Sequence, residues 1–275
     1  MKRTKSDINK LVDKSVEYIR SQVSIRPKVA IVLGSGLGDF AESLIGKTII
    51  ETSSIPHYPR STVEGHKGKL IFGKLNHLSV LAFQGRVHFY ESGDLETILY
   101  PIRVAHAFNI KTLIVTNAAG GFNPNFKPGD LMMITDQINL TFENPLVGLK
   151  QSAISHNLYD KSIQQLIIVA AHEQNIPVKE GIYCGIKGPS YETAAEVEMI
   201  RRIGADAVGM STVNEVSLAR AFGMRVGGIS CITNLSTGIL DQKLSHREVT
   251  EIANMVKDPF SKLLQGIIHN IGKET

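Results

Sequence analysis

Short apolar runs alternate with amphipathic segments along the chain, and this alternation is its main structural signal. Runs rich in Val, Ile and Leu predict strands. They cover residues 28–38, 78–86, 112–121, 130–140, 178–188, 205–211 and 226–234. Helical spacing of apolar residues predicts helices over 94–108, 158–174, 194–204 and 214–223, and a last helix from about Arg247 towards Ile268. This order indicates an α/β fold with a largely parallel or mixed sheet flanked by helices.

The organisation of the chain is simple. Neither an internal repeat nor a low-complexity linker divides it, so residues 1–275 are predicted to form a single domain. No stretch approaches the roughly 18 uninterrupted apolar residues of a membrane span. The N-terminal stretch is basic but lacks an apolar core and a cleavage site, which predicts no secretory signal.

Composition narrows the cellular setting and the class of partner. Hydrophobic residues make up 43% and charged residues 20% of the chain, as in ordinary soluble proteins. Cys184 and Cys231 lie far apart and outside any CxxC pattern, so we expect buried small side chains in a reducing, cytoplasmic setting. The net charge of +4 comes from scattered basic residues. It indicates no nucleic-acid surface, and a small anionic substrate would explain it as well.

Several familiar motifs fail on inspection. Residues 34–38, Gly-Ser-Gly-Leu-Gly, follow a predicted strand, but Asp39 stands where a dinucleotide-binding fingerprint needs its third glycine. Residues 46–48 imitate the end of a P-loop without its first glycine, and Ser35 lies outside a GxSxG motif. No HExxH motif or Cys/His cluster occurs, so no metal site is expected.

Hydrogen-bond donors suited to an anion lie near the predicted strand ends. The glycine loop at 34–38 can bring backbone N–H groups together beside the Ser35 hydroxyl, although it would also serve as a tight turn. His66 lies in a polar, glycine-containing stretch, where a lone histidine is usually only solvated. Residues 117–121 end a strand at a place where α/β proteins gather ligands.

The segment "QGRVHFYESGD" adds more positive charge. Arg86, His88 and Tyr90 alternate, so an extended chain would direct all three side chains the same way. The guanidinium of Arg86 is permanently charged and is costly to bury without an anionic partner. Together with the glycine loop, these residues predict a phosphate-sized set of donors.

Capping boxes of the Ser/Thr-x-x-Glu type mark several helix starts. They occupy residues 193–196, 212–215 and 245–248. Glu192 and Ser211 directly precede the first two boxes, and His246 lies within the third. A residue at a helix start is held in place and faces free N–H groups, which favour anions. Helix stability alone would also explain each box.

A series of motifs gives the chain a specific resemblance. From about Val29 to the final helix it resembles the trimeric, low-molecular-mass purine nucleoside phosphorylases of the inosine/guanosine type. The motifs are LGSGLG, STVEGHKG, QGRVHFYE, TNAAGG, INLTFENPLVG, KGPSYETAAE, VGMSTVNE, ITNLSTG and LSHREV, in the family's order. The resemblance implies a mixed, partly barrel-like sheet, a homotrimer with active sites near subunit boundaries, and no metal or organic cofactor.

The resemblance also implies roles for individual residues. Phosphate, a co-substrate, would be bound by Ser35, His66, Arg86, His88, the backbone N–H of Ala118, and Ser211. The nucleoside would be bound by Tyr90, Tyr191, Glu192, Met210, Asn234 and His246. The catalytic groups would be Asn234, His88, Glu192 and His246. Without their neighbours, Tyr191 and Met210 would be taken for core residues, and Glu192 for a favourable helix-dipole charge.

The reaction implied is phosphorolysis of inosine, guanosine and their 2′-deoxy forms to free purine and (deoxy)ribose 1-phosphate. Asn234 both donates and accepts hydrogen bonds, which suits 6-oxopurines, whereas the related methylthioadenosine phosphorylases carry aspartate there. A methylthioadenosine or adenosine-type phosphorylase and a nucleoside-binding module without turnover are the alternatives. Neither a nucleic acid nor a membrane is an expected partner.

The sequence departs from the family pattern at three places. Ser92, Gly93 and Asp94 follow Tyr90-Glu91 where the family usually has glycine. Asn214 replaces a common proline, which we expect to be a minor capping change. The segment 149–158 is short and lacks the phenylalanine with which the family reaches the neighbouring subunit's ribose. No residue is therefore assigned to the outer wall of the sugar pocket.

Overall fold

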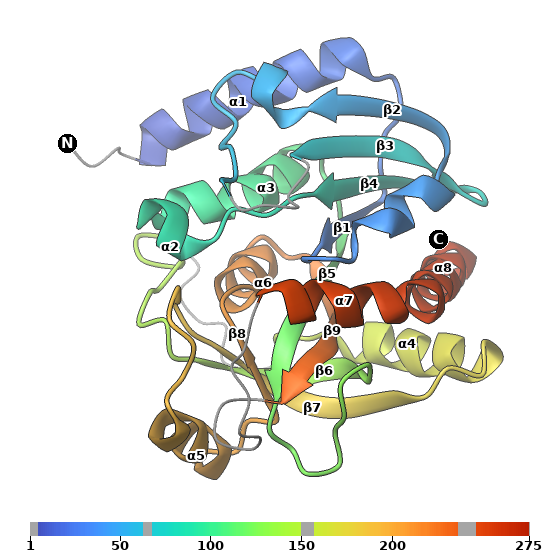
Figure 1. Ribbon diagram of the computed structural model, residues 1–275. Coiled ribbons are helices and arrows are strands. Elements are labelled where there is room, and N and C mark those ends of the chain that lie inside the picture. The colour runs from blue at the N-terminus through green and yellow to red at the C-terminus, as the bar shows by residue number, and fades with distance from the viewer. Residues whose placement is uncertain (1–4, 63–67, 150–156, 236–245, 275) are drawn as a thin grey trace.

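One mixed sheet runs through the protein (Figure 1). The computed structural model describes residues 5–62, 68–149, 157–235 and 246–274. Within them nine strands pair in the order β2-β3-β4-β1-β5-β8-β7-β6-β9. The strands are β1 (Val29–Leu33), β2 (Ile45–Glu51), β3 (Lys69–Leu75), β4 (Leu78–Gln84), β5 (Thr112–Gly121), β6 (Leu131–Asn139), β7 (Val178–Gly185), β8 (Ala207–Gly209) and β9 (Arg225–Leu235).

Part of this sheet is closed on itself. β5 also pairs with β9 in parallel over its whole length, so β5, β8, β7, β6 and β9 form a ring. β1, β4, β3 and β2 extend the sheet from this ring. This arrangement confirms the mixed, partly barrel-like sheet that the sequence resemblance implied. Because β1, β4, β5 and β9 run parallel, their carboxyl ends meet at one edge.

Helices cover the sheet on both faces (Figure 1). They are α1 (Lys5–Gln22), α2 (Phe89–Ser92), α3 (Leu95–Ala107), α4 (Lys161–Glu173), α5 (Ala194–Arg202), α6 (Val213–Ala221), α7 (His246–Met255) and α8 (Lys257–Lys273), with short 3-10 turns at Gly38–Ser43 and Thr52–Ser54. One core contains side chains of α1, α3 and α6, a second contains those of α4 and α8, and a smaller third contains those of α5. In β1, Ala30 and Val32 enter the first core while Ile31 and Leu33 enter the second. Burial on both faces explains the continuous apolar run of this strand.

The predicted strands all form, but the last helix needs correction and some elements were not predicted. The last helix is two helices, α7 and α8, which are separated at Val256. α1, β2 and β3 were not predicted. β2 shows no alternation of apolar and polar residues because it is an edge strand in which almost every side chain is exposed. Cys184 and Cys231 are buried and free, as predicted. Among the described residues, no helix has the length and apolar character needed to cross a bilayer.

A glycine in β9 tests how tightly this core is packed. A Cβ added at Gly228 would lie 2.7 Å from Cε1 of Tyr159 and 2.9 Å from Cδ1 of Ile134. We expect Gly228→Ala to destabilise the protein by about 1–3 kcal/mol, as overpacking does. Urea unfolding should show a lower midpoint with an unchanged slope.

Gly272 in α8 provides the matched control. Its added Cβ would meet only Leu78 Cβ, at an ordinary 3.7 Å, and alanine suits a helix better than glycine. We expect Gly272→Ala to leave the midpoint unchanged or slightly higher. A Gly228→Ala variant with the wild-type midpoint would show that the core accommodates the extra methyl group.

Candidate active site

A cavity of about 380 Å³ opens at the shared carboxyl edge of the parallel strands. Its volume lies within the roughly 300–1,000 Å³ that is usual for small-molecule sites. The predicted site residues that line it are Ser35, Arg86, His88, Tyr90, Ala118, Tyr191, Glu192, Met210, Ser211 and Asn234. His66 lies outside the described residues, and His246 begins α7 with its side chain outside them. The structure thus brings together every predicted residue whose side chain it describes.

Some lining residues were not predicted individually. They are Asn117, Ala119, Gly120, Pro189, Val208, Gly209 and Thr233. Most are small residues that adjoin a predicted site residue. Their position near a strand end was the only feature of the sequence that could have indicated them. Other residues support the site through hydrogen bonds: Glu91 and Thr116 were missed by the sequence analysis, and Thr212 and Glu215 were predicted only as a capping box.

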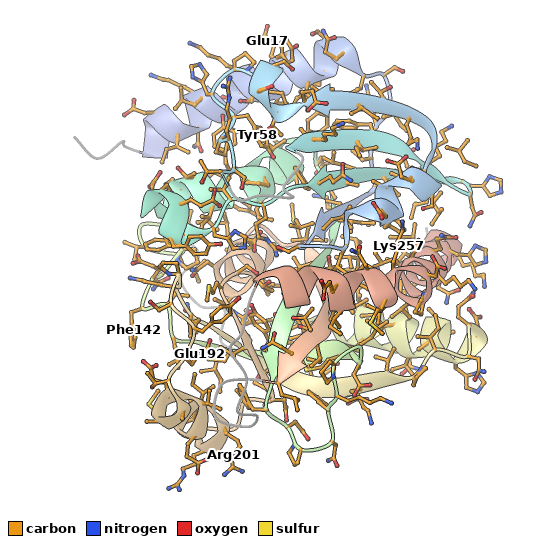
Figure 2. All side chains as sticks on the ribbon, viewed as in Figure 1. Glu17, Tyr58, Phe142, Glu192, Arg201 and Lys257 are labelled. Atoms are coloured by element: carbon orange, nitrogen blue, oxygen red, sulfur yellow. The ribbon has the colours of Figure 1, made fainter. Side chains whose placement is uncertain are left out.

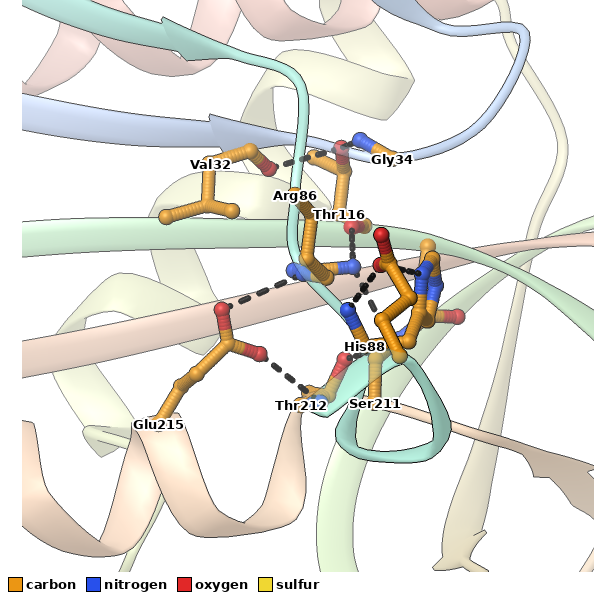
Figure 3. Close-up of polar contacts among 10 residues, drawn as sticks. Val32, Gly34, Arg86, His88, Thr116, Ser211, Thr212 and Glu215 are labelled. Atoms are coloured by element: carbon orange, nitrogen blue, oxygen red, sulfur yellow. Dashed lines mark hydrogen bonds and ion pairs between the residues drawn. The ribbon is translucent and has the colours of Figure 1, made fainter. Parts of the chain in front are cut away.

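The glycine loop after β1 is fixed to β5 by one threonine. The Gly34 N–H donates to Oγ1 of Thr116 at 3.0 Å, and that hydroxyl donates to the carbonyl of Val32 at 3.0 Å (Figure 3). A Cβ at Gly34 would lie 2.7 Å from Asn117 Cα, a backbone atom that cannot move aside. Glycine is therefore required at this position, and the close approach brings the loop that carries Ser35 against the middle of β5.

Arg86 is buried in the cavity wall, with only 5% of its surface exposed. Its Nε donates to Oε1 of Glu215 at 3.1 Å, and its Nη1 donates to the Thr116 carbonyl and to Ser211 Oγ, each at 3.1 Å (Figure 3). The sequence predicted that this guanidinium would need an anionic partner. That anionic partner is the carboxylate of Glu215, which is buried beside Arg86.

Ser211 is followed by a strained turn. Thr212 has φ 77° and ψ −55°, and the N–H of Val213 donates to the Ser211 carbonyl at 2.9 Å, which defines a γ-turn. A β-branched residue rarely adopts positive φ. Hydrogen bonds hold it there: Asn117 Nδ2 donates to Thr212 Oγ1 at 2.9 Å, and the Thr212 N–H donates to Oε2 of Glu215 at 2.8 Å. The predicted capping box at 212–215 is present.

The extended alternation of the three side chains stops after His88: His88 has extended backbone angles, φ −95° and ψ 156°, but Tyr90 lies in a short helix. The short helix α2 begins at Phe89, and the rings of His88 and Tyr90 stack with centroids 5.1 Å apart. The cause is Glu91, whose Oε1 accepts from the His88 N–H at 2.5 Å and closes a capping box. Both rings nevertheless line the cavity.

Glu91 also holds residues 61 and 62, which precede β3 in the chain. Its Oε2 accepts hydrogen bonds from the Ser61 hydroxyl at 3.1 Å and from the N–H and hydroxyl of Thr62 at 2.5 and 2.9 Å. Burial opposes ionisation of this carboxyl, but the hydrogen bonds from His88 and Thr62 outweigh burial and hold the pKa of Glu91 well below its usual range. Glu91 is therefore an anionic anchor for two segments of the site.

Another part of the cavity wall is formed by the end of β9 and by the segment that precedes α5. The β5–β9 register shifts after Ala119, so that Gly120 pairs with Asn234. Irregularities of this kind change the direction of side chains and are common beside active sites. Thr233 and Asn234 both line the cavity. The Thr233 hydroxyl lies 3.0 Å from Asn234 Oδ1 and donates to it.

Glu192 stands just before α5, where Thr193 and Glu196 form the predicted capping box. Its side chain is buried (labelled in Figure 2), and this burial raises the pKa of its carboxyl. A buried carboxylate favours ligands with N–H donors. Glu192 therefore suits a ligand with N–H donors better than an anion.

The site offers no alternative metal or thiol chemistry within the described chain. In that part of the protein, no group of three His, Cys, Asp or Glu residues is arranged to hold a metal ion. Burial raises the pKa of the Cys184 and Cys231 thiols to about 12, so neither is a ready nucleophile.

Comparisons with known proteins agree with this geometry. Residues 28–269 match the sequence model of the phosphorylase superfamily. The chain is 46% identical to purine nucleoside phosphorylase 1 of Bacillus subtilis (strain 168), covering 94% of this chain and 97% of that protein. It is 40% identical to the purine nucleoside phosphorylase of Rattus norvegicus, covering 94% of each.

Solved structures give the same result. The crystal structure of Schistosoma mansoni purine nucleoside phosphorylase in complex with adenosine matches with a TM-score of 0.85 and 36% identity, over 94% of this chain and 95% of that one. Its complex with inosine matches with a TM-score of 0.83 and 35% identity over the same shares.

The chain belongs to the purine nucleoside phosphorylase family. It is a pentosyltransferase that catalyses the phosphorolysis of purine nucleosides. The sequence resemblance predicted both the family and this activity, and both are confirmed.

The chain's departures from the family pattern acquire a structural meaning. Asn214 is more than a capping change, so that expectation is wrong. Its buried side chain donates to Thr141 Oγ1 at 3.2 Å and accepts from Asn139 Nδ2 at 3.4 Å, which ties α6 to the end of β6. Gly93 ends α2 with φ 64°, and Asp94 caps α3. Most of the shortened segment, residues 150–156, lies outside the described residues.

The lowered pKa of Glu91 makes a pH-dependent prediction. A carboxyl whose pKa is lower in the folded state stabilises the fold above its unfolded pKa, about 4.3, and loses this effect as the pH falls towards the folded pKa. We expect Glu91→Gln to cost about 1–3 kcal/mol at pH 7. The difference from wild type should shrink as the pH falls below about 4.3. Urea unfolding at several pH values measures this.

Glu17 is the control, because it is an exposed carboxylate on α1 (Figure 2). We expect Glu17→Gln to change stability little at any of these pH values. A Glu91→Gln cost that stayed constant down to low pH would contradict the anchoring role of the ionised carboxylate.

Proposed function

We propose that this enzyme cleaves 6-oxopurine nucleosides, namely inosine, guanosine and their 2′-deoxy forms, with inorganic phosphate as the co-substrate. One observation carries the proposal. A single cavity has a buried guanidinium with two hydroxyls, Arg86 with Ser35 and Ser211, in one part of its wall, and a buried carboxylate and a carboxamide, Glu192 and Asn234, in another. The first set suits phosphate, and the second suits the edge of a purine.

In the proposed phosphate half, donors converge from several elements. Ser35 follows β1, Arg86 and His88 follow β4, and Ser211 precedes the N-terminus of α6, which itself favours anions. The N–H of Ala118 is assigned here as a further donor. His66 keeps this role as a prediction from sequence.

In the proposed nucleoside half, Tyr90 and Met210 contact the ribose and the exposed Tyr191 packs on the purine. Glu192 accepts hydrogen bonds from base N–H groups, and Asn234 binds around N7 and O6. His246 is assigned to the 5′-hydroxyl on sequence grounds alone. The Schistosoma mansoni relative, crystallised with inosine and with adenosine, supports a purine nucleoside here and keeps the adenosine-type activity as the second candidate.

The proposed chemistry follows from where charge develops. As the glycosidic bond stretches, the ribose becomes positive and the purine negative. Phosphate, held beneath the sugar by Arg86 and the hydroxyls, is the nucleophile and also a counter-charge. Asn234 stabilises the departing purine, and one preorganised donor of this kind contributes about 2.7–4 kcal/mol in the transition state. Holding both reactants in one cavity lowers the barrier further, so the proposal requires neither a metal nor an organic cofactor.

The proposal extends to assembly and setting. A homotrimer is supported by large apolar side chains exposed on the single chain after β6: Phe142, at the outer edge of the molecule in Figure 2, is 88% exposed, and Val147 is 68% exposed. A subunit contact would remove such surface from water. The free, buried cysteines agree with a cytoplasmic, reducing location. We assign all 275 residues to one phosphorylase domain.

The decisive experiment supplies and withholds phosphate. We expect hypoxanthine release from inosine in the presence of phosphate or arsenate and almost none in a buffer without either. Product analysis should identify ribose 1-phosphate when phosphate is present. Equal release without phosphate would indicate a hydrolase, and binding of inosine without any release would indicate a module without turnover.

A substitution at Asn234 tests how the base is read. An ionised aspartate offers only acceptors, so it repels O6 but can accept a hydrogen bond from a 6-amino group. An unpaired buried polar group costs roughly 1–3 kcal/mol, so we expect Asn234→Asp to lower the inosine-to-adenosine ratio of kcat/KM by about one to two decades. Because Glu192 also reads the purine, preference should shift without reversing.

Asn125→Asp is the matched control, since it makes the same chemical change at an exposed residue outside the cavity lining. Its kcat/KM ratio should equal that of the wild type. An unchanged ratio in folded Asn234→Asp would remove Asn234 from base recognition.

A further inference from the structure

Glu215, in the first turn of α6, connects two donors of the proposed phosphate half. Its side chain is buried, with 3% of the residue exposed, and its two oxygens have different partners. Oε1 accepts from Arg86 Nε at 3.1 Å, and Oε2 accepts from the Thr212 N–H at 2.8 Å (Figure 3). One carboxylate thus bridges a guanidinium and a strained turn.

The comparison with another capping box shows what is special about this carboxylate. At α5, Glu196 uses one oxygen, Oε2, for both the N–H and the hydroxyl of Thr193, at 2.7 and 2.9 Å. That glutamate is exposed, and no cation is among these partners. Capping a helix therefore does not require the burial of Glu215 or its ion pair with Arg86.

The contacts around Glu215 form a closed circuit. Glu215 binds Arg86, Arg86 Nη1 donates to Ser211 Oγ at 3.1 Å, Ser211 leads into Thr212, and the Thr212 N–H returns to Glu215. Thr212 keeps its unfavourable φ of 77° only because its surroundings hold it there. A change at the carboxylate would therefore loosen both the guanidinium, which would keep its bond to the Thr116 carbonyl, and the turn that carries the Ser211 hydroxyl, which would keep the bond from Asn117.

We propose that Glu215 is a positioning residue for phosphate: by bridging Arg86 Nε and the Thr212 N–H, it fixes the Arg86 guanidinium and the Ser211 hydroxyl as one preorganised set of donors. This inference rests on the proposed function. Glu215 also has an opposing effect, because its negative charge repels phosphate. Preorganised donors spare the ligand the cost of ordering them, and we infer that this gain is the larger of the two.

The test uses two substitutions that break the bridge in different ways. Glu215→Gln keeps the size but turns an NH₂ donor towards one of the two donors that the carboxylate now accepts from. Glu215→Asp keeps the counter-charge of Arg86 but is one methylene group too short to span both partners. Asp therefore remains the test if the uncompensated Arg86 prevents Glu215→Gln from folding.

The readout is the phosphate KM at saturating inosine and the inosine KM at saturating phosphate. We expect both variants to raise the phosphate KM by about tenfold or more, the loss of one charged hydrogen bond, and to change the inosine KM by less than about threefold. In an Arg86→Ala background, Glu215→Gln should raise the phosphate KM by a smaller factor than in the wild type, because residues that act through each other are not additive.

Glu196→Gln is the matched control, because it makes the same chemical change at a capping-box glutamate whose capping partner is Thr193 and not Arg86. It should leave the phosphate KM unchanged. An unchanged phosphate KM in Glu215→Asp or Glu215→Gln, with only a lower Tm, would reduce Glu215 to a helix cap. A lower phosphate KM would make it a competing anion. Either result overturns the inference.

The wild-type assay separates this inference from the proposed function. Inosine cleavage that does not depend on phosphate would overturn the proposed function itself. Phosphate-dependent cleavage by the wild type, combined with wild-type phosphate KM values in the Glu215 variants, would overturn only the positioning role.

Discussion

The pairing of β5 is the constraint from which the rest of the site follows. One edge of β5 pairs with β9 along its whole length, while the other edge pairs first with β1 over 112–115 and then with β8 at 120–121. In the described structure, residues 116–119 have no partner strand on that second edge. Here the Thr116 hydroxyl accepts a hydrogen bond from the N–H of Gly34, just after β1, and the Thr116 carbonyl accepts one from Arg86. The cavity lies where the sheet divides, as is usual for ligand sites in α/β proteins.

Environment gives similar carboxyl groups around this cavity different properties. Glu91 is surrounded by donors from His88 and Thr62, which stabilise its ionised form. Glu192 is buried, and this burial disfavours its ionised form and raises its pKa. Glu215 is matched to a buried cation. The ionised form of one carboxyl is thus stabilised by hydrogen bonds, that of another is disfavoured by burial, and that of the third balances the charge of Arg86.

Much of this could be read from the sequence, and the remainder has physical reasons. Apolar runs predicted the strands of the ring because a strand that is buried on both faces is a nearly continuous run of apolar residues in the sequence. α2 was missed because Glu91, a tertiary anchor for Thr62, also caps that short turn. The capping box predicted that Glu215 faces Thr212, but its second partner, Arg86, follows from the three-dimensional path of β4 and not from any local pattern.

The separation of Arg86 from its counter-ion affects how the chain is made. Glu215 follows Arg86 by 129 residues. At a synthesis rate of about 5–20 residues per second, on the order of ten seconds pass before the carboxylate emerges. A guanidinium is too costly to bury alone, so the end of β4 must stay hydrated during that interval. The N-terminal strands can pair early, but the cavity closes only after α6 has been synthesised, which protects the nascent chain from enclosing an unpaired charge.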